Sequence, residues 1–294
     1  MTLTQLFDSS FLARLDRLEL LSRKTFSGRT AGKRRSCRRG HGVEFVDYRN
    51  YVQGDDLRYL DWNIYGRLER LFLKISLQEE DIHVHFLLDA SASMSFGSPS
   101  KFDHARRIAA ALAYVALGSL DRVEITSFRE GLSERLQPCR GKGSIFKIME
   151  FLDRLETEGQ TGLLEACRRY RVAEPSPGVV FLISDFLDPS GFEDALRHFI
   201  SRRFDLCLVQ VLARGEVEPD LSGDLRLVDI ETGQAHEVSI GPAVMKRYRR
   251  TFDFFCGSLR RFAMERDVAY VRTISDEPFD RLVLNTLRSL GVLR

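Results

Sequence analysis

The chain has 294 residues, of which 44% are hydrophobic, so it is long and apolar enough to bury a sizeable core in one large or two ordinary domains. Its 44 basic and 42 acidic residues leave a net charge of +2, which gives no indication of a polyanionic partner for the chain as a whole. The five cysteines have no CxxC spacing, the first residues lack the apolar centre of a secretory signal, and the longest apolar run is shorter than the roughly 18 residues of a membrane span. We therefore expect a protein of the cytoplasm without a membrane-spanning helix.

The first predicted element is a short amphipathic helix from Ser9 to about Thr25. The following stretch, residues 24–41, is rich in Arg and Lys and has no acidic residue. It could be an arm that binds the phosphates of nucleic acid, or a solvated loop. We favour the loop and do not expect nucleic acid as a partner, because no aromatic residue lies between Gly28 and His41 to stack on bases.

Residues 42–81 change character. Alternating apolar residues and a Gly-Asp-Asp turn predict short strands and turns rather than helices, with Trp62 as a packing anchor. Such a segment cannot easily bury its apolar face alone. We therefore divide the chain into residues 1–80, an N-terminal helix, basic loop and β-rich segment packed on the main body, and residues 81–294, the main α/β domain.

The main domain begins with the sequence IHVHFLLDASASM, in which an apolar run of strand length stops at Asp89. Alternate side chains of an extended segment point the same way, so Asp89, Ser91 and Ser93 can converge on one point. One carboxylate and two hydroxyls form a set of hard oxygen ligands that suits Mg²⁺, Mn²⁺ or Ca²⁺. The alternative is an ordinary turn, since Asp and Ser are common in turns and helix caps.

A second apolar strand, Val179 to Asp185, also ends in an aspartate. Parallel strands present their carboxyl ends on one edge of a sheet, so Asp185 is expected near Asp89. Between the two strands, Thr161 stands in a glycine-flanked turn that opens a helical pattern and could place its hydroxyl at the same edge. Taken alone, Thr161 and Asp185 could equally be helix caps.

Apolar strands alternate with helical patterns through the rest of the chain, which is typical of a mostly parallel sheet with helices on both faces. We therefore predict a three-layer, Rossmann-like α/β fold. A stretch near residues 224–241 breaks this rhythm and is predicted to be an inserted β-hairpin. A long helix with an apolar stripe is expected from Ala243 to Glu265.

Asp89, Ser91, Ser93, Thr161 and Asp185 together resemble the metal-ion-dependent adhesion site of von Willebrand factor A domains. The resemblance implies that the serines and the threonine hold Mg²⁺ directly or through water, that the aspartates hold its waters, and that a carboxylate of a partner completes the shell. One departure is Gln160, which stands where the family usually has glycine before the threonine.

A second resemblance is more specific and runs from about residue 24 to the end of the chain. The signature E-F-x-x-x-R-x-Y-x-x-G-D-D-x-R-x-x-D-W, followed some twenty residues later by LLDASASM, is similar to the bacterial family catalogued as domain of unknown function 58. Members are typically encoded beside MoxR-type AAA+ ATPases, so the resemblance implies such an ATPase or its client as partner. The signature falls on Glu44, Phe45, Arg49, Tyr51, Gly54, Asp55, Asp56, Arg58, Asp61 and Trp62.

We therefore expect a metal-dependent protein-binding module and not an enzyme. The alternative is a Mg²⁺-dependent phosphohydrolase with Asp89 as nucleophile, but Ser91 stands where a second acid would be needed, and the sequence has no GxxxxGK[ST] phosphate loop. Nucleic-acid binding through residues 24–41 is the other alternative.

Overall fold

The computed structural model describes residues 9–18, 20, 35–38, 44–53, 55, 57, 60–79, 82–173, 176–200, 204–286 and 292. The chain divides into two compact units. The larger comprises Met1–Phe26 and Ile82–Arg294, and the smaller comprises Ser27–Asp81.

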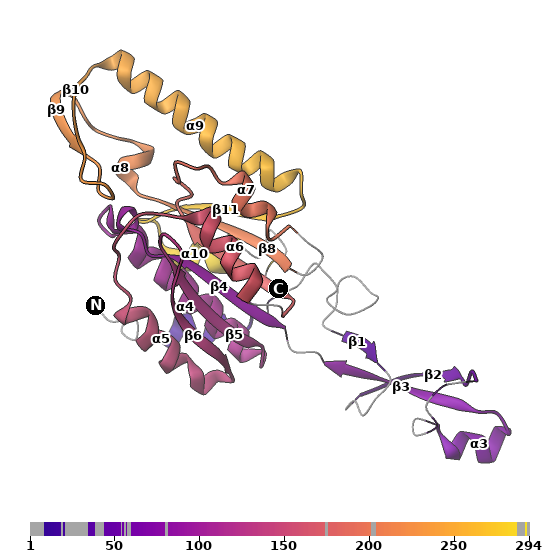
Figure 1. Ribbon diagram of the computed structural model, residues 1–294. Helices are drawn as coiled ribbons and strands as arrows, with labels where there is room; N and C mark the ends of the chain where they lie inside the picture. The colour runs from indigo at the N-terminus through magenta and orange to yellow at the C-terminus, as the bar shows by residue number, and fades with distance from the viewer. Residues whose placement is uncertain are drawn as a thin grey trace. The chain divides into compact units, whose positions relative to one another are not determined.

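A six-stranded sheet forms the centre of the larger unit (Figure 1). Its strand order is β11-β8-β7-β4-β5-β6, and every neighbouring pair is parallel except β5 and β6. The sheet is the mostly parallel one that the alternating pattern predicts. Its strands are β4 (His83–Asp89), β5 (Arg122–Phe128), β6 (Leu132–Arg140), β7 (Gly178–Ser184), β8 (Phe204–Leu212) and β11 (Ala269–Ile274).

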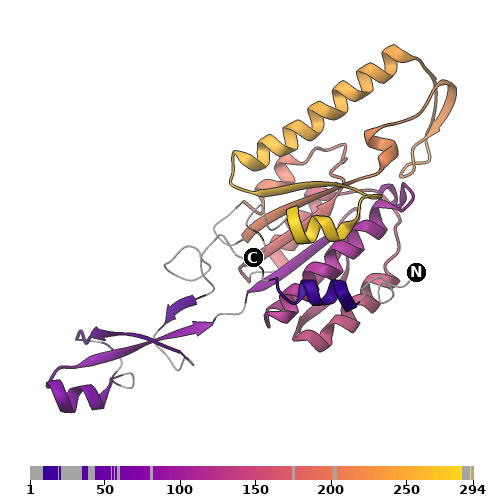
Figure 2. The same cartoon turned by 180° about the vertical axis from the view of Figure 1, so that it is seen from behind.

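Helices cover both faces of this sheet, which confirms the predicted three-layer α/β fold (Figures 1 and 2). One face packs against α2, α4 and α5, and the other against α6, α7 and α9. The helices are α2 (Ser9–Leu15), α4 (Lys101–Gly118), α5 (Ile145–Arg154), α6 (Leu163–Ala173), α7 (Glu193–Arg197), α8 (Arg214–Val217), α9 (Pro242–Met264) and α10 (Phe279–Arg281), with short turns η2 (Ala92–Ser95), η3 (Lys142–Ser144) and η4 (Leu282–Thr286).

Helix α4 lies across the middle of the sheet because its sequence is rich in alanine, whose small side chain permits close packing. Residues Ile108 to Ala113 are fully buried. The helix begins where Ser100 accepts a hydrogen bond from the Asp103 N–H at 3.0 Å, which is the usual role of a serine at a helix N-terminus. This start fixes the turn that follows the end of β4, where the predicted site lies.

The predicted hairpin is present as strands β9 (Gly223–Val228) and β10 (Ala235–Ile240), which pair antiparallel. Most of its residues are exposed. The long helix α9 follows, as predicted, and it buries Phe252, Leu259 and Phe262. The first part of the predicted apolar stripe is not buried. Val244 and Tyr248, which belong to this part, are exposed.

The smaller unit contains a three-stranded antiparallel sheet in the order β1-β3-β2, formed by β1 (Arg35–Arg38), β2 (Glu44–Asn50) and β3 (Phe72–Glu79). The prediction of strands without helices was wrong at α3 (Trp62–Leu68). The carboxylate of Asp61 starts this helix by accepting hydrogen bonds from the N–H groups of Asn63 and Ile64. Trp62 is 62% exposed, so it is not the packing anchor that we expected.

The boundary predicted at residue 80 needs a correction at the N-terminus. Helix α2 belongs to the larger unit, because Phe11 and Leu15 are buried in its core and the ring of Phe11 packs edge-on against Phe279 at 5.2 Å. Packing of the β-rich segment on the main body stays a prediction. Most of the basic stretch 24–41 lies outside the described residues. The helices in the described part of the chain lack the combination of length and apolar character that a membrane span requires.

Candidate functional site

The strand ends that the sequence singles out do meet at one edge of the central sheet. Asp89 is the last residue of β4, and Asp185 follows the last residue of β7, the neighbouring parallel strand. Both aspartates are fully buried. This is the carboxyl edge at which open α/β sheets bind ligands.

The hydroxyls of the loop after β4 connect the two aspartates. The Ser91 and Ser93 hydroxyl oxygens lie 3.0 Å apart, and the Ser93 hydroxyl donates to Asp185 Oδ2 at 3.4 Å. Oδ1 of Asp89 accepts the Ser91 N–H at 3.0 Å, and its Oδ2 accepts the Ser184 hydroxyl at 2.6 Å. Four of the five predicted residues therefore form one connected cluster, and Ser184 is a member that the sequence analysis missed.

Thr161 reaches the same region through its loop. The Ala92 N–H donates to the Gly159 carbonyl at 2.9 Å, and the Glu158 N–H donates to the Ala90 carbonyl at 3.0 Å, so residues 158–162 lie against the serine loop. Thr161 does not cap helix α6. The N–H of Leu163, the first residue of this helix, donates to Asp188 Oδ2 at 2.8 Å. The Thr161 hydroxyl donates instead to a carboxylate.

That carboxylate comes from the turn of the β9–β10 hairpin. Glu231 Oε1 accepts the Thr161 hydroxyl at 2.8 Å, and its Oε2 accepts the Thr161 N–H at 3.2 Å. Both oxygens of one acid are therefore bound by one residue of the predicted site. Nothing in the sequence around Glu231 identifies this contact, because the hairpin lies 70 residues further along the chain.

A lysine forms the other part of the site that sequence analysis missed. Lys101, in the first turn of α4, is 1% exposed, and its ammonium lies 2.5 Å from Asp185 Oδ2 and 2.6 Å from Glu216 Oε1. Glu216 belongs to α8, directly after β8, and its Oε2 accepts the Ala213 N–H. A lysine at the start of a helix opposes the helix dipole, so its position could have indicated a carboxylate partner.

The electrostatics of this cluster are unbalanced toward negative charge. Burial, together with the nearby Asp185, raises the pKa of Asp89 to about 7. Burial also raises the pKa of Glu216, whereas the carboxylates of Asp185 and Glu216 outweigh the burial of Lys101 and raise the pKa of its ammonium. The ammonium of Lys101 is thus paired with two carboxylates while Asp89 lies beside Asp185, and a cation of higher charge would be favoured when Asp89 is ionised.

The oxygen atoms present fit a small divalent cation. Neighbouring ligands of an octahedral Mg²⁺ ion, bound at 2.0–2.1 Å, lie about 3 Å apart. The Ser91 and Ser93 hydroxyls already have this separation. The ligand set contains only oxygen atoms, which suits Mg²⁺ and Mn²⁺ better than Zn²⁺.

Comparison with known proteins identifies relatives but no activity. An uncharacterized protein of Mycobacterium tuberculosis is 28% identical over 249 residues, which is 83% of this chain and 78% of that protein, and one of Mycobacterium bovis matches equally.

Among solved structures, a conserved hypothetical protein BatB from Bacteroides thetaiotaomicron has 14% identity over 71% of this chain and 98% of its own, with a TM-score of 0.47. An aerotolerance-related membrane protein from Bacteroides fragilis has 16% identity over the same shares, with a TM-score of 0.44. The model of the family described as "Protein of unknown function DUF58" matches residues 47–253, which is more than half of the chain. The chain therefore belongs to the DUF58 family of proteins of unknown function, as its signature residues led us to expect.

Proposed function

We propose that this protein is a metal-dependent protein-binding module, which uses a divalent cation at the Asp89 cluster to bind a carboxylate of a partner protein. The observation that carries the proposal is the pair of Ser91 and Ser93 hydroxyls, which lie 3.0 Å apart. Ser93 contacts Asp185, and Ser91 contacts the buried Asp89. These residues, with Thr161, would hold Mg²⁺, or Mn²⁺ or Ca²⁺ in its place. Neutral hydroxyls leave much of the ion's charge uncompensated, so the ion would attract an incoming acid strongly.

The contact between Thr161 and Glu231 supports a carboxylate as the ligand. Two donors of Thr161, its hydroxyl and its N–H, bind both oxygens of a single acid. A Glu or Asp of another protein has the same chemical group and could be bound in the same way. The partner that we propose is a MoxR-type AAA+ ATPase or its client, for which this protein would act as an adaptor in assembly or activation.

The environment of Asp89 supports binding rather than catalysis. A nucleophilic carboxylate must reach its substrate, but Asp89 is fully buried, and its two oxygens are hydrogen-bonded to Ser91 and Ser184. We therefore propose that the site is not that of a phosphohydrolase. Turnover of a phosphate ester that requires both Mg²⁺ and Asp89 would reverse this conclusion.

Partner binding provides the functional test. The full-length protein, immobilised in Mg²⁺, is expected to retain a MoxR-type ATPase from the same organism, and retention should fall at least tenfold in EDTA or with Ser93→Ala. Ser95→Ala is a matched control, since Ser95 belongs to the same turn but its hydroxyl donates to the Ala92 carbonyl. Equal retention with and without chelator would contradict a metal-dependent contact.

Glu231 allows a second prediction about the same site. If its carboxylate competes with the acid of a partner, Glu231→Gln should increase the apparent affinity for that partner, by about 5- to 150-fold for a coupling free energy of 1–3 kcal/mol. Glu237→Gln, in the exposed strand β10 of the same hairpin, is the control and should leave affinity unchanged. A lower affinity of Glu231→Gln would show that the hairpin helps binding instead.

A further inference from the structure

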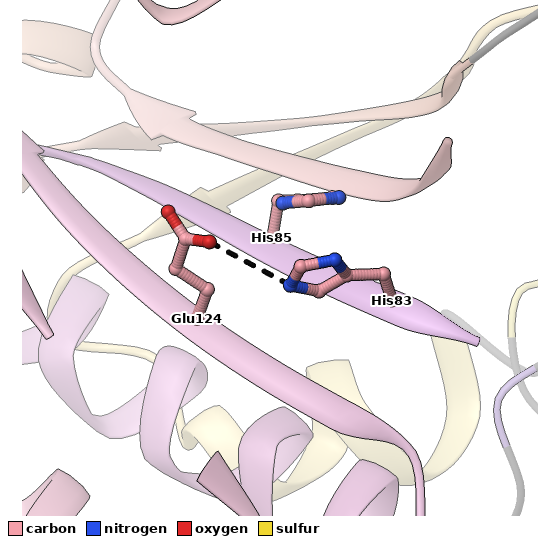
Figure 3. Close-up of side chains that lie close together, drawn as sticks. All are labelled: His83, His85 and Glu124. Carbon is pink, nitrogen blue, oxygen red and sulfur yellow. Dashed lines mark ion pairs between the residues drawn. The ribbon is translucent and has the colours of Figure 1, made fainter. Parts of the chain in front are cut away.

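A second group of metal-ligating side chains lies at the other end of the same strand. His83 is the first residue of β4 and His85 stands two positions further, so both side chains project from one face of the sheet. Glu124 is the residue of the parallel strand β5 that pairs with His85. Figure 3 shows the three side chains gathered on this face, with His83 directed at Glu124. They lie at the amino end of β4, whereas Asp89 is at its carboxyl end.

The three residues are close enough to share an ion. One ligand atom from each lies within 4.8 Å of those of the other two, and His83 Nε2 is 3.6 Å from Glu124 Oε2. Both of these atoms are buried and face each other at a distance longer than a hydrogen bond, and His85 Nε2 is buried beside them. Buried polar atoms are almost always hydrogen-bonded, so a buried imidazole and carboxylate held 3.6 Å apart are placed to share an ion between them.

The surroundings hold these side chains in orientations that suit metal binding. The hydroxyl oxygen of Tyr170 lies 2.8 Å from His85 Nδ1. The same hydroxyl can donate to Glu124 Oε1 at 3.4 Å. In the tautomer of His85 that carries its proton on Nδ1, the oxygen of Tyr170 accepts Nδ1–H and the lone pair is on Nε2. Arg135 Nε binds the same Oε1 at 2.6 Å, which leaves Oε2 of Glu124 for a ligand.

The charge states agree with this arrangement. Burial, with the neighbouring His83, lowers the pKa of His85 to about 3, so its ring is neutral at pH 7 and can donate a lone pair. Burial opposes ionisation of Glu124, but His83 and Arg135 outweigh it and lower the pKa to about 2.

We propose that His83, His85 and Glu124 form a binding site for a zinc-type transition-metal ion, independent of the Asp89 cluster. Two imidazoles and one carboxylate suit Zn²⁺ and related ions and leave a fourth position for water or an external ligand. The ligand atoms of a tetrahedral Zn²⁺ lie about 3.3 Å apart, so the cluster must contract. The two imidazole rings are tilted by 33° with their centroids 4.1 Å apart, and His83, whose side chain is 11% exposed, is the less enclosed of the two.

The test is zinc binding by the full-length protein. After removal of metal with EDTA and dialysis against Zn²⁺, the protein is expected to retain one ion, measured by mass spectrometry of the metal content. Zn²⁺ should also raise the melting temperature in proportion to the logarithm of its concentration. Co²⁺ should give the visible absorption bands of a tetrahedral site with nitrogen and oxygen ligands. Failure to retain Zn²⁺ at micromolar concentration would overturn the proposal.

Variants assign the ion to this cluster. His85→Gln and Glu124→Gln should weaken Zn²⁺ binding at least tenfold, and Tyr170→Phe about tenfold through loss of the hydrogen bond to His85. His83→Gln is the second ligand variant, and its more exposed position makes it the least disturbing to folding. His236→Gln, on the exposed strand β10, is the control for a surface histidine. Zinc binding that persists in His83→Gln would place the ion elsewhere.

Two further controls separate this site from the remaining ligands. Asp89→Asn should leave Zn²⁺ binding unchanged and affect only Mg²⁺, because the two clusters lie at opposite ends of β4. Cys139→Ser removes the half-buried thiol and should also have no effect. A loss of Zn²⁺ with either variant would contradict the assignment to the histidine cluster, whatever becomes of the proposed Mg²⁺ site.

Discussion

Replacement of Lys101 by methionine is expected to lower the free energy of unfolding by about 3–5 kcal/mol in metal-free buffer. The ammonium is the only basic group in hydrogen-bonding contact with the two acids Asp185 and Glu216 among the interactions of the described residues. Methionine fills a similar volume but leaves the buried Asp185 and the partly buried Glu216 without a counter-charge. Chemical denaturation monitored by circular dichroism measures the effect.

Lys142→Met is the matched control for this substitution. Lys142 also binds an acid, Asp16 at 2.6 Å, but its side chain is 53% exposed. Ion pairs in such positions contribute about 1 kcal/mol or less. If Lys101→Met cost no more than Lys142→Met, the ammonium would not be balancing the charge of the site.

The second large effect is the pH dependence introduced by Asp89. Its pKa rises to about 7 in the folded protein because of burial and Asp185, whereas an aspartate in the unfolded chain has its ordinary value near 4. Between these values the folded state holds a proton that the unfolded state has lost, so the contribution of Asp89 to stability is present at pH 4 and lost as the pH rises to 7. Asp89→Asn keeps the shape and cannot ionise.

The stability of Asp89→Asn relative to the unmodified protein should therefore increase between pH 4 and pH 8, by roughly 4 kcal/mol in the absence of divalent cations. Denaturant titrations at several pH values measure this difference. Asp194→Asn, at an exposed position of α7, should follow the unmodified protein at every pH. A pH-independent difference would mean that Asp89 is already ionised at low pH in the folded state.

The parts of the fold with strong periodicity were predictable. Strands β4 and β7 are short apolar runs that end in polar loops, and their parallel pairing brings Asp89 and Asp185 to one edge. Serine and aspartate at these strand ends were sufficient to predict which side chains meet there. Helix α4 was predictable from its alanine pattern and its Ser100 start.

The remaining features depend on tertiary contacts that have no local pattern. In the sequence, Lys101 has the pattern of a surface residue at the start of a helix. Its partner Glu216 lies 115 residues further along the chain. Glu231 reads as an ordinary turn residue. Helix α3 was missed because it has only seven residues and none of them is buried, although Trp62, Tyr65 and Leu68 recur at helical spacing. The His-x-His spacing of His83 and His85 was visible, but it gains meaning only when Glu124 is placed on the neighbouring strand.

The proposed metal site is tested most directly by the binding of Mg²⁺ itself. Isothermal titration calorimetry measures this binding at pH 8, where Asp89 is ionised. One Mg²⁺ ion should bind to the unmodified protein, and the heat should disappear in Asp89→Asn and fall strongly in Ser93→Ala. Binding that is absent from the unmodified protein, or unchanged in both variants, would contradict a metal site at the carboxyl edge of β4 and β7.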